Sequence, residues 1–191
     1  LQEINQRLSE LSERFGRNLL ADTKALAVTF ERDELAGLSE EQLAAYEEGG
    51  RYVVPVELPT TQSLQAELED STSRHKLFDA SRQRGRESNP EIVLESVALR
   101  LERARLLGFD SHADFVIAEE TAGTAAAARQ LIADLAPAAA ANANAERKLA
   151  SELAGVEVDG ADWPYWQAKQ REEELGIDEA ELRKYFPLEQ V

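Results

Sequence analysis

Apolar residues recur every three or four positions through most of this sequence, which is the spacing of one face of an α-helix. The spacing is clearest in a predicted helix over residues 1–24, where one side carries Ile4, Leu8, Leu11, Phe15 and Leu19. It also predicts helices over residues 63–84, 90–108 and 124–153. We therefore expect a mainly α fold, a helical array in which these apolar faces are buried.

Two short stretches instead alternate apolar and polar residues with the period of a β-strand. They cover Leu26–Phe30 and Val53–Leu58, and a short helix over residues 40–47, opened by a capping box at Ser39, lies between them. We expect the two stretches to pair as a short two-stranded antiparallel β ribbon within residues 25–58. Such a ribbon is marginal alone and should pack against a helix.

Capping residues mark the ends of the later helices. Asn89-Pro90 begins a central helix, Asp162-Trp163-Pro164 begins another that Gly176 ends, and Asp178 begins a last short one. The two central helices are long enough to pack antiparallel. Their apolar residues predict one shared core that contains Leu77, Phe78, Leu101, Leu106 and Leu107.

The charge of the chain limits its partners. Its 37 acidic and 21 basic residues give a formal net charge of −16, and the acidic residues are spread along the predicted helices. Nucleic acid is not an expected partner, because phosphate binding requires a basic face. A membrane is not expected either, since no stretch approaches the roughly 18 apolar residues of a span. Without a signal sequence at its start, the protein is expected to be cytoplasmic.

The sequence contains no methionine and begins at Leu1. A complete, unprocessed translation product would begin with methionine, so we expect a fragment of a longer protein. At the other end, Tyr185–Val191 carries large apolar side chains that a continuation would cover. We therefore interpret residues 1–191 as a single helical section of a larger protein.

Residues suited to hydrolytic chemistry are sparse. A zinc peptidase commonly uses two histidines one helical turn apart with a glutamate beside the first, the pattern H-E-x-x-H. His75 and His112 are the only histidines, neither precedes a glutamate, and neither has a second histidine four residues on. A lone histidine on a helix is more often structural than a ligand.

Other candidate groups are no more specific. Doublets such as Glu119-Glu120 are uninformative among so many acidic residues, and the aromatic group over residues 163–166 favours core packing over peptide contact. The chain has no cysteine, no G-x-S-x-G elbow and no phosphate-binding glycine loop. We predict no catalytic, cofactor-binding or metal-ligating residue in this chain.

Four blocks, in the same order, resemble segments of the thimet oligopeptidase family of zinc metallopeptidases. Arg74–Gly85 is similar to that family's R-x-x-L-[FY]-x-A-x-x-x-R-G segment, and Leu99–Phe109 to its L-R-x-E-x-A-x-L-L-G-[FY] segment. Asp162–Trp166 and Tyr185–Val191 resemble its D-W-x-[YF]-[YW] and Y-F-P-L-x-x-V segments. The early part, from Glu34 onward, is most similar to the bacterial peptidyl-dipeptidase branch, which removes dipeptides from peptide C-termini.

The resemblance implies a mostly helical protein in which two halves enclose a deep channel with one zinc ion at its floor. The family's H-E-x-x-H motif lies beyond Val191, so this chain would be a non-catalytic part of the channel wall. Zinc is then the cofactor of the intact enzyme, and none is expected in this chain. Its expected partners are short peptide substrates and the remainder of the same polypeptide.

A different class of function also fits the sequence. A free-standing helical module with this acidic surface could bind a basic protein partner. The gene distinguishes the two hypotheses, because only the peptidase hypothesis requires a reading frame that continues to an H-E-x-x-H motif.

Overall fold

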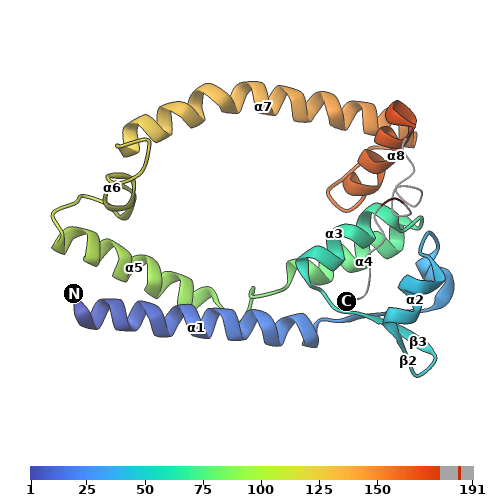
Figure 1. Cartoon of the computed structure of the whole chain (residues 1–191), viewed down its shortest axis with the longest axis horizontal. Coiled ribbons are helices and arrows are strands. Elements are labelled where there is room, and N and C mark those ends of the chain that lie inside the picture. Colours follow the sequence, from blue (N-terminus) through green and yellow to red (C-terminus); the bar gives the residue numbers. More distant parts are fainter. Residues whose placement is uncertain (177–184, 186–191) are drawn as a thin grey trace. The chain divides into compact units, whose positions relative to one another are not determined.

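The computed structural model describes residues 1–176 and Tyr185, and the described residues are mainly α-helical, as predicted (Figure 1). Its α-helices are α1 (Gln2–Ala25), α2 (Glu40–Tyr46), α3 (Leu58–Glu67), α4 (Ser71–Arg82), α5 (Pro90–Leu106), α6 (His112–Ile117), α7 (Ala125–Ala154) and α8 (Trp163–Leu175). A short 3-10 helix, η1, covers Arg32–Leu35. The last short helix predicted from Asp178 lies outside the described residues.

The chain divides into two compact units. The first consists of Leu1–Leu26 and Arg82–Asn144, and the second of Ala27–Ser81 and the described residues from 145 onward. Each unit therefore combines an early and a late segment of the chain.

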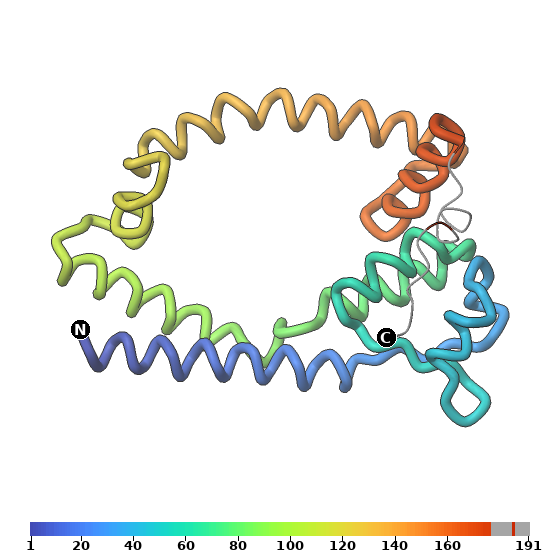
Figure 2. Tube along the Cα trace, viewed as in Figure 1, coloured from blue at the N-terminus to red at the C-terminus, as the bar shows by residue number. Residues whose placement is uncertain are grey.

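In the first unit, α1 packs along α5 (Figure 2). The predicted apolar face of α1 buries Leu11 completely, and α5 buries Ile92 and Ala104. At the edge of this packing, Arg7 forms a two-pronged ion pair with Glu95, with Nε–Oε1 and Nη2–Oε2 distances of 2.6 and 2.9 Å. These contacts explain why the long first helix is stable although it has no side-chain cap.

Side chains of α1 also hold the turn between α4 and α5. The Asp22 carboxylate accepts hydrogen bonds from the Gly85 amide at 2.7 Å and the Ser88 hydroxyl at 2.9 Å. Gly85 has a φ of +72°, and a Cβ there would lie 2.8 Å from Cδ2 of Leu19. Glycine is required here both by the left-handed backbone and by the close approach of α1.

The second unit contains the predicted antiparallel ribbon. Strand β1 (Val28–Phe30) pairs with β3 (Arg51–Val54), and Val28 lies opposite Val54. A third strand of two residues, β2 (Glu47–Glu48), extends the sheet to the order β1-β3-β2 and was not predicted. Both strands differ from their predicted bounds: β1 begins at Val28, and β3 begins at Arg51 and ends at Val54. The predicted strand residue Leu58 instead begins α3, which has Pro59 in its first turn.

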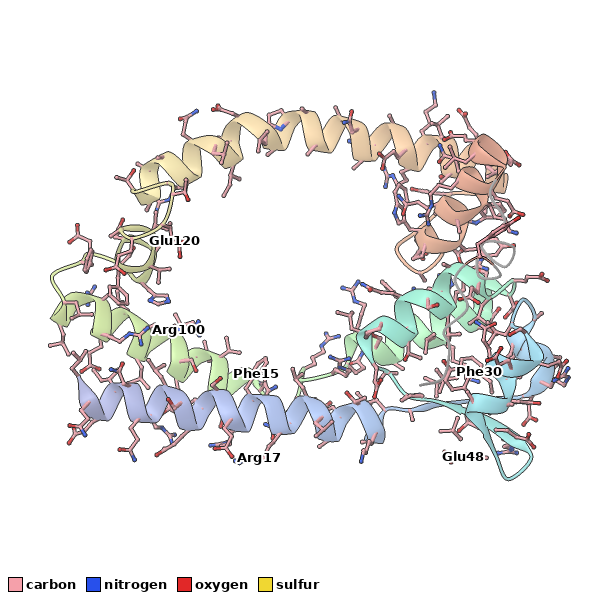
Figure 3. The ribbon with its side chains drawn as sticks, in the orientation of Figure 1. Phe15, Arg17, Phe30, Glu48, Arg100 and Glu120 are labelled. Carbon is pink, nitrogen blue, oxygen red and sulfur yellow. The ribbon has the colours of Figure 1, made fainter. Side chains whose placement is uncertain are left out.

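The ribbon packs against α4, as a ribbon of this size requires. Phe30, labelled in Figure 3, is almost completely buried. The Nζ atom of Lys76 on α4 lies 4.5 Å from the centre of the Phe30 ring. Lys76 also donates to the Thr29 carbonyl at 2.8 Å and to Glu34 at 2.9 Å. One side chain of α4 thus contacts both the ribbon and η1.

The single helix predicted over residues 63–84 is wrong, because the chain breaks between α3 and α4 at residues 68–70. Asp70 caps the new helix, since its carboxylate accepts from the Ser73 amide at 2.7 Å and from the Ser73 hydroxyl at 2.8 Å. The carbonyls of Leu68 and Glu69 are freed by the break and accept hydrogen bonds from Arg74 instead.

The predicted shared core is also wrong, because its residues fall in different units. Leu77 is fully buried and Phe78 partly buried in the second unit, whereas Leu101 is partly buried in the first. Leu106 and Leu107, at the end of α5, are 61% and 41% exposed. The cause is that α5 turns its other side, with Ile92 and Ala104, toward α1.

Helix α7 is exposed along most of its length. Only Ala125 and Ala150 among its residues are buried, while Leu131, Ile132 and Leu135 are all more than half exposed. The helix continues through Pro137. Among the described helices, none is both long and apolar enough to cross a membrane.

Candidate functional site

A group of polar side chains joins the beginning of α4 to the beginning of α8, within the second unit. His75 and Arg74 lie in the second turn of α4, and Asp162 is the N-cap of α8. Asp159 precedes α8 by three residues and faces His75. We call these four residues and Ser71 the α4–α8 cluster.

The centre of the cluster is a buried ion pair. The Nε atom of Arg74 lies 2.7 Å from Oδ1 of Asp162, and the two side chains are 3% and 12% exposed. Arg74 also donates through Nη1 to the carbonyls of Leu68 at 2.7 Å and Glu69 at 3.0 Å. Its guanidinium lies 4.3 Å from the centre of the Tyr165 ring, a cation–π contact.

Ser71 completes the coordination of the buried carboxylate. Its hydroxyl lies 3.0 and 2.9 Å from the two oxygens of Asp162 and donates its proton to them. The Asp162 charge is therefore neutralised by one cation and stabilised by one hydroxyl, which is the condition under which a carboxylate tolerates burial.

His75 uses both ring nitrogens. Nδ1 lies 2.8 Å from the carbonyl oxygen of Ser71, and Nε2 lies 2.8 Å from Oδ2 of Asp159. Neither oxygen carries a proton when Asp159 is ionised, so both contacts are hydrogen bonds together only in the doubly protonated imidazolium form of His75. The Ser71 carbonyl and then the Asp159 carboxylate raise the pKa of His75 above its usual value.

Asp159 also organises the loop that leads into α8. Its Oδ1 accepts from the amides of Ala161 at 2.9 Å and Asp162 at 3.2 Å. Burial raises the pKa of Asp159, but the hydrogen bonds from His75 and from these amides outweigh it, so the pKa is lowered overall. The carboxylate is therefore ionised at neutral pH and available to His75.

A metal ion is the first ligand to consider at such a group, because ligand atoms of His75, Asp159 and Asp162 lie within 4.8 Å of one another. A ligating histidine must offer a nitrogen lone pair, whereas Nδ1 and Nε2 of His75 each lie 2.8 Å from an acceptor oxygen, of Ser71 and of Asp159. Asp162 is also already paired with Arg74, whose positive charge would repel a cation. The donor set therefore does not fit the catalytic zinc implied by the family resemblance.

His112 lies in the first unit, at the start of α6. Burial, followed by the charges of Arg100 and Arg103, lowers the pKa of His112. Its Nδ1 atom is buried without a hydrogen-bond partner, and its ring lies 6.3 Å from that of Phe115. Among the described residues, His112 belongs to no group of three potential metal ligands, so a structural role fits better than a ligand role.

The remaining sequence candidates lie apart from any catalytic arrangement. Tyr165 and Trp166 contact each other edge to face at 5.2 Å and Tyr165 lies over Arg74, but the aromatic group is only half-buried, so the expected core packing is met in part. Glu119 and Glu120 are exposed on the segment after α6. Sequence reasoning missed Asp159, although the D-x-x-D spacing of Asp159 and Asp162 before a helix was visible.

Comparison with known proteins identifies the class. The model of peptidase family M3 matches residues 64–191, so the chain belongs to that family. It is 31% identical, over its whole length, to the dipeptidyl carboxypeptidase of Escherichia coli. It is 29% identical to oligopeptidase A of Salmonella typhimurium over 97% of this chain, and 27% identical to a probable cytosolic oligopeptidase A of Arabidopsis thaliana over 99% of it.

These matches confirm the family resemblance seen in the sequence, including its closeness to a dipeptidyl carboxypeptidase. The chain spans about 30% of the length of each of these three relatives. They are peptidases by name, and this chain corresponds to a minor part of each.

Proposed function

We propose that this chain is a non-catalytic section of a zinc-dependent oligopeptidase of the peptidyl-dipeptidase type, which in its intact form hydrolyses short peptides. The observation that carries the proposal is the alignment of the whole chain with 30% of a dipeptidyl carboxypeptidase, combined with the absence of an H-E-x-x-H motif from the sequence. Zinc would be held by residues outside this chain and would activate water for attack on the peptide bond.

Within the intact protein, the chain would form part of the wall of the peptide channel. Exposed apolar side chains support a role that includes contact with the remainder of the polypeptide, because such surface is costly in water. Such side chains on two helices include Val93, Leu94 and Val97 on α5 and Leu131, Ile132 and Leu135 on α7. A cytoplasmic location accords with the name of the Arabidopsis relative.

The alternative is a free-standing helical module that binds a basic protein through its acidic surface. The net charge of −16 favours it. The peptidase section is the better proposal, because acidic surfaces are common on soluble proteins whereas a family match over residues 64–191 is specific.

A peptide-cleavage assay tests the proposal. The purified chain and the intact protein are each incubated with unstructured peptides of five to ten residues, and released C-terminal dipeptides are detected by mass spectrometry. We expect the intact protein to release dipeptides and to lose this activity when a chelator removes its metal, whereas the chain alone releases none. Chelator-sensitive cleavage by the chain alone would contradict the proposal.

A further inference from the structure

The loop between α7 and α8, residues 155–162, is fastened to α4 at two points. Asp159 accepts the hydrogen bond from His75 described above. Gly160 lies against Phe78, so closely that a Cβ at this position would be 3.2 Å from the ring atom Cζ. His75 and Phe78 are three residues apart and share one face of α4. The loop therefore closes over that face.

Only one of these two fastenings depends on a proton. Packing of Gly160 on Phe78 does not change with pH, but a neutral imidazole has a single N–H to donate. If that hydrogen stays on Nδ1, a lone pair of Nε2 faces the Asp159 carboxylate. If it stays on Nε2, the bond to Asp159 is kept, but a lone pair of Nδ1 faces the Ser71 carbonyl, with the Ser71 hydroxyl 3.4 Å from Nδ1. Loss of one proton thus turns one of the two hydrogen bonds into a repulsive contact.

We infer that His75 is a proton-dependent latch for the α7–α8 loop, holding the loop on α4 while both ring nitrogens carry protons and loosening it locally when one proton is lost. The latch consists of His75 and Asp159, with the Ser71 carbonyl fixing the ring. It is independent of the peptidase activity proposed above, and it acts within the second unit.

The charged groups around the ring favour this behaviour. Asp159 from the loop faces Nε2, and Asp162 from the start of α8 lies with Oδ1 3.8 Å from Nδ1. On the same helix as His75, Arg74 directs its charge at Asp162 and so does not cancel the attraction of Asp159 for the ring. Because two carboxylates and a carbonyl surround the imidazole, the doubly protonated form is the one that the site stabilises.

The direction of the pH effect follows from the raised pKa of His75. A proton bound more tightly in the closed state stabilises that state, and the stabilisation is complete below the ordinary histidine pKa of about 6.5. It is lost as the pH rises through the raised pKa of the closed state. Between these two pKa values, the closing constant of the loop should fall with pH, by at most about tenfold for each pH unit because one proton is released.

Amide hydrogen exchange and NMR on the whole chain test the latch. The probes are the amides of Ala161 and Asp162, which donate to Asp159, and the imidazole of His75. Exchange rates are converted to protection factors, which remove the intrinsic pH dependence of exchange. The protection factors of both amides should fall as His75 loses its proton. The circular dichroism of the helices should stay constant over this range.

Variants separate the latch from general pH effects. His75→Gln should leave the two protection factors independent of pH, and His112→Gln, the matched control, should leave the wild-type dependence in place. Asp159→Asn keeps the shape of an exposed side chain but removes its charge. This variant should lower the pKa of His75 and abolish the dependence even if the His75 variant fails to fold.

Three results would overturn the inference. The first is constant protection of both amides while His75 titrates, and the second is titration of His75 at the pKa of a free imidazole. The third is a fall in protection that persists unchanged in both His75→Gln and Asp159→Asn.

Discussion

Arg74→Ala should destabilise the second unit by about 3–5 kcal/mol, the cost expected when a buried ion pair loses one partner. The substitution leaves the buried Asp162 carboxylate with the Ser71 hydroxyl and, 3.8 Å from Oδ1, Nδ1 of His75 as its remaining partners. It also frees the carbonyls of Leu68 and Glu69 at the break between α3 and α4. The ion pair, the hydrogen bonds to the two carbonyls and the cation–π contact with Tyr165 are lost together.

Denaturant unfolding followed by tryptophan fluorescence measures this effect in the correct unit, because Trp163 and Trp166, the only tryptophans, both lie on α8. Arg51→Ala is the control, since it removes an exposed ion pair with Glu31 in the same unit. We expect the control to change the free energy of unfolding by less than about 1 kcal/mol. A similarly small change for Arg74→Ala would show that the cluster does not hold the unit together.

Leu77→Ala should cost about 2–5 kcal/mol, the range for removing a buried leucine side chain and leaving a cavity. Leu77 is fully buried on α4 and is the part of the predicted core that the structure retains. Leu175→Ala is the matched control, because it makes the same chemical change at a position of α8 that is 62% exposed.

The same fluorescence transition reports both leucine variants. The control should stay within about 0.5 kcal/mol of the wild type, as surface substitutions usually do. If the two variants were equally stable, the face of α4 that carries Leu77 would not be part of the core.

Local patterns in the sequence predicted most of the helices. The apolar stripe of α1 has a single period over 24 residues and leaves no alternative to a helix. At α2, the capping box forms as predicted, since Ser39 accepts from the Gln42 amide at 3.3 Å and its own amide donates to the Gln42 side chain at 2.9 Å. These features depend on residues within one or two turns of each other.

The break at residues 68–70 could not be predicted in this way. Leu64, Leu68 and His75 keep helical spacing across it, and an aspartate such as Asp70 is compatible with both a helix interior and an N-cap. The break is favoured by a contact distant in sequence, because Arg74 binds the freed carbonyls only while Asp162 holds its guanidinium in place.

The α4–α8 cluster was likewise only partly predictable. His75 was a candidate from its residue type, and Asp162 was predicted as a helix cap. His75 binds Asp159, which is 84 residues away in the sequence, and Asp162 binds Ser71, which is 91 residues away. No periodicity relates positions at such separations. Recognising Asp159 would have required knowing that the loop before α8 closes on α4.

The central claim is that this chain is part of a zinc peptidase but does not itself hold the catalytic zinc. Calorimetric titration of zinc into the purified chain and into the metal-free intact protein tests this claim directly. A catalytic zinc site needs about three protein ligands with free lone pairs, and the α4–α8 cluster does not offer them. We predict one tight site in the intact protein and no stoichiometric binding to the chain alone. Tight one-to-one binding by the chain that His75→Gln abolishes would contradict the account.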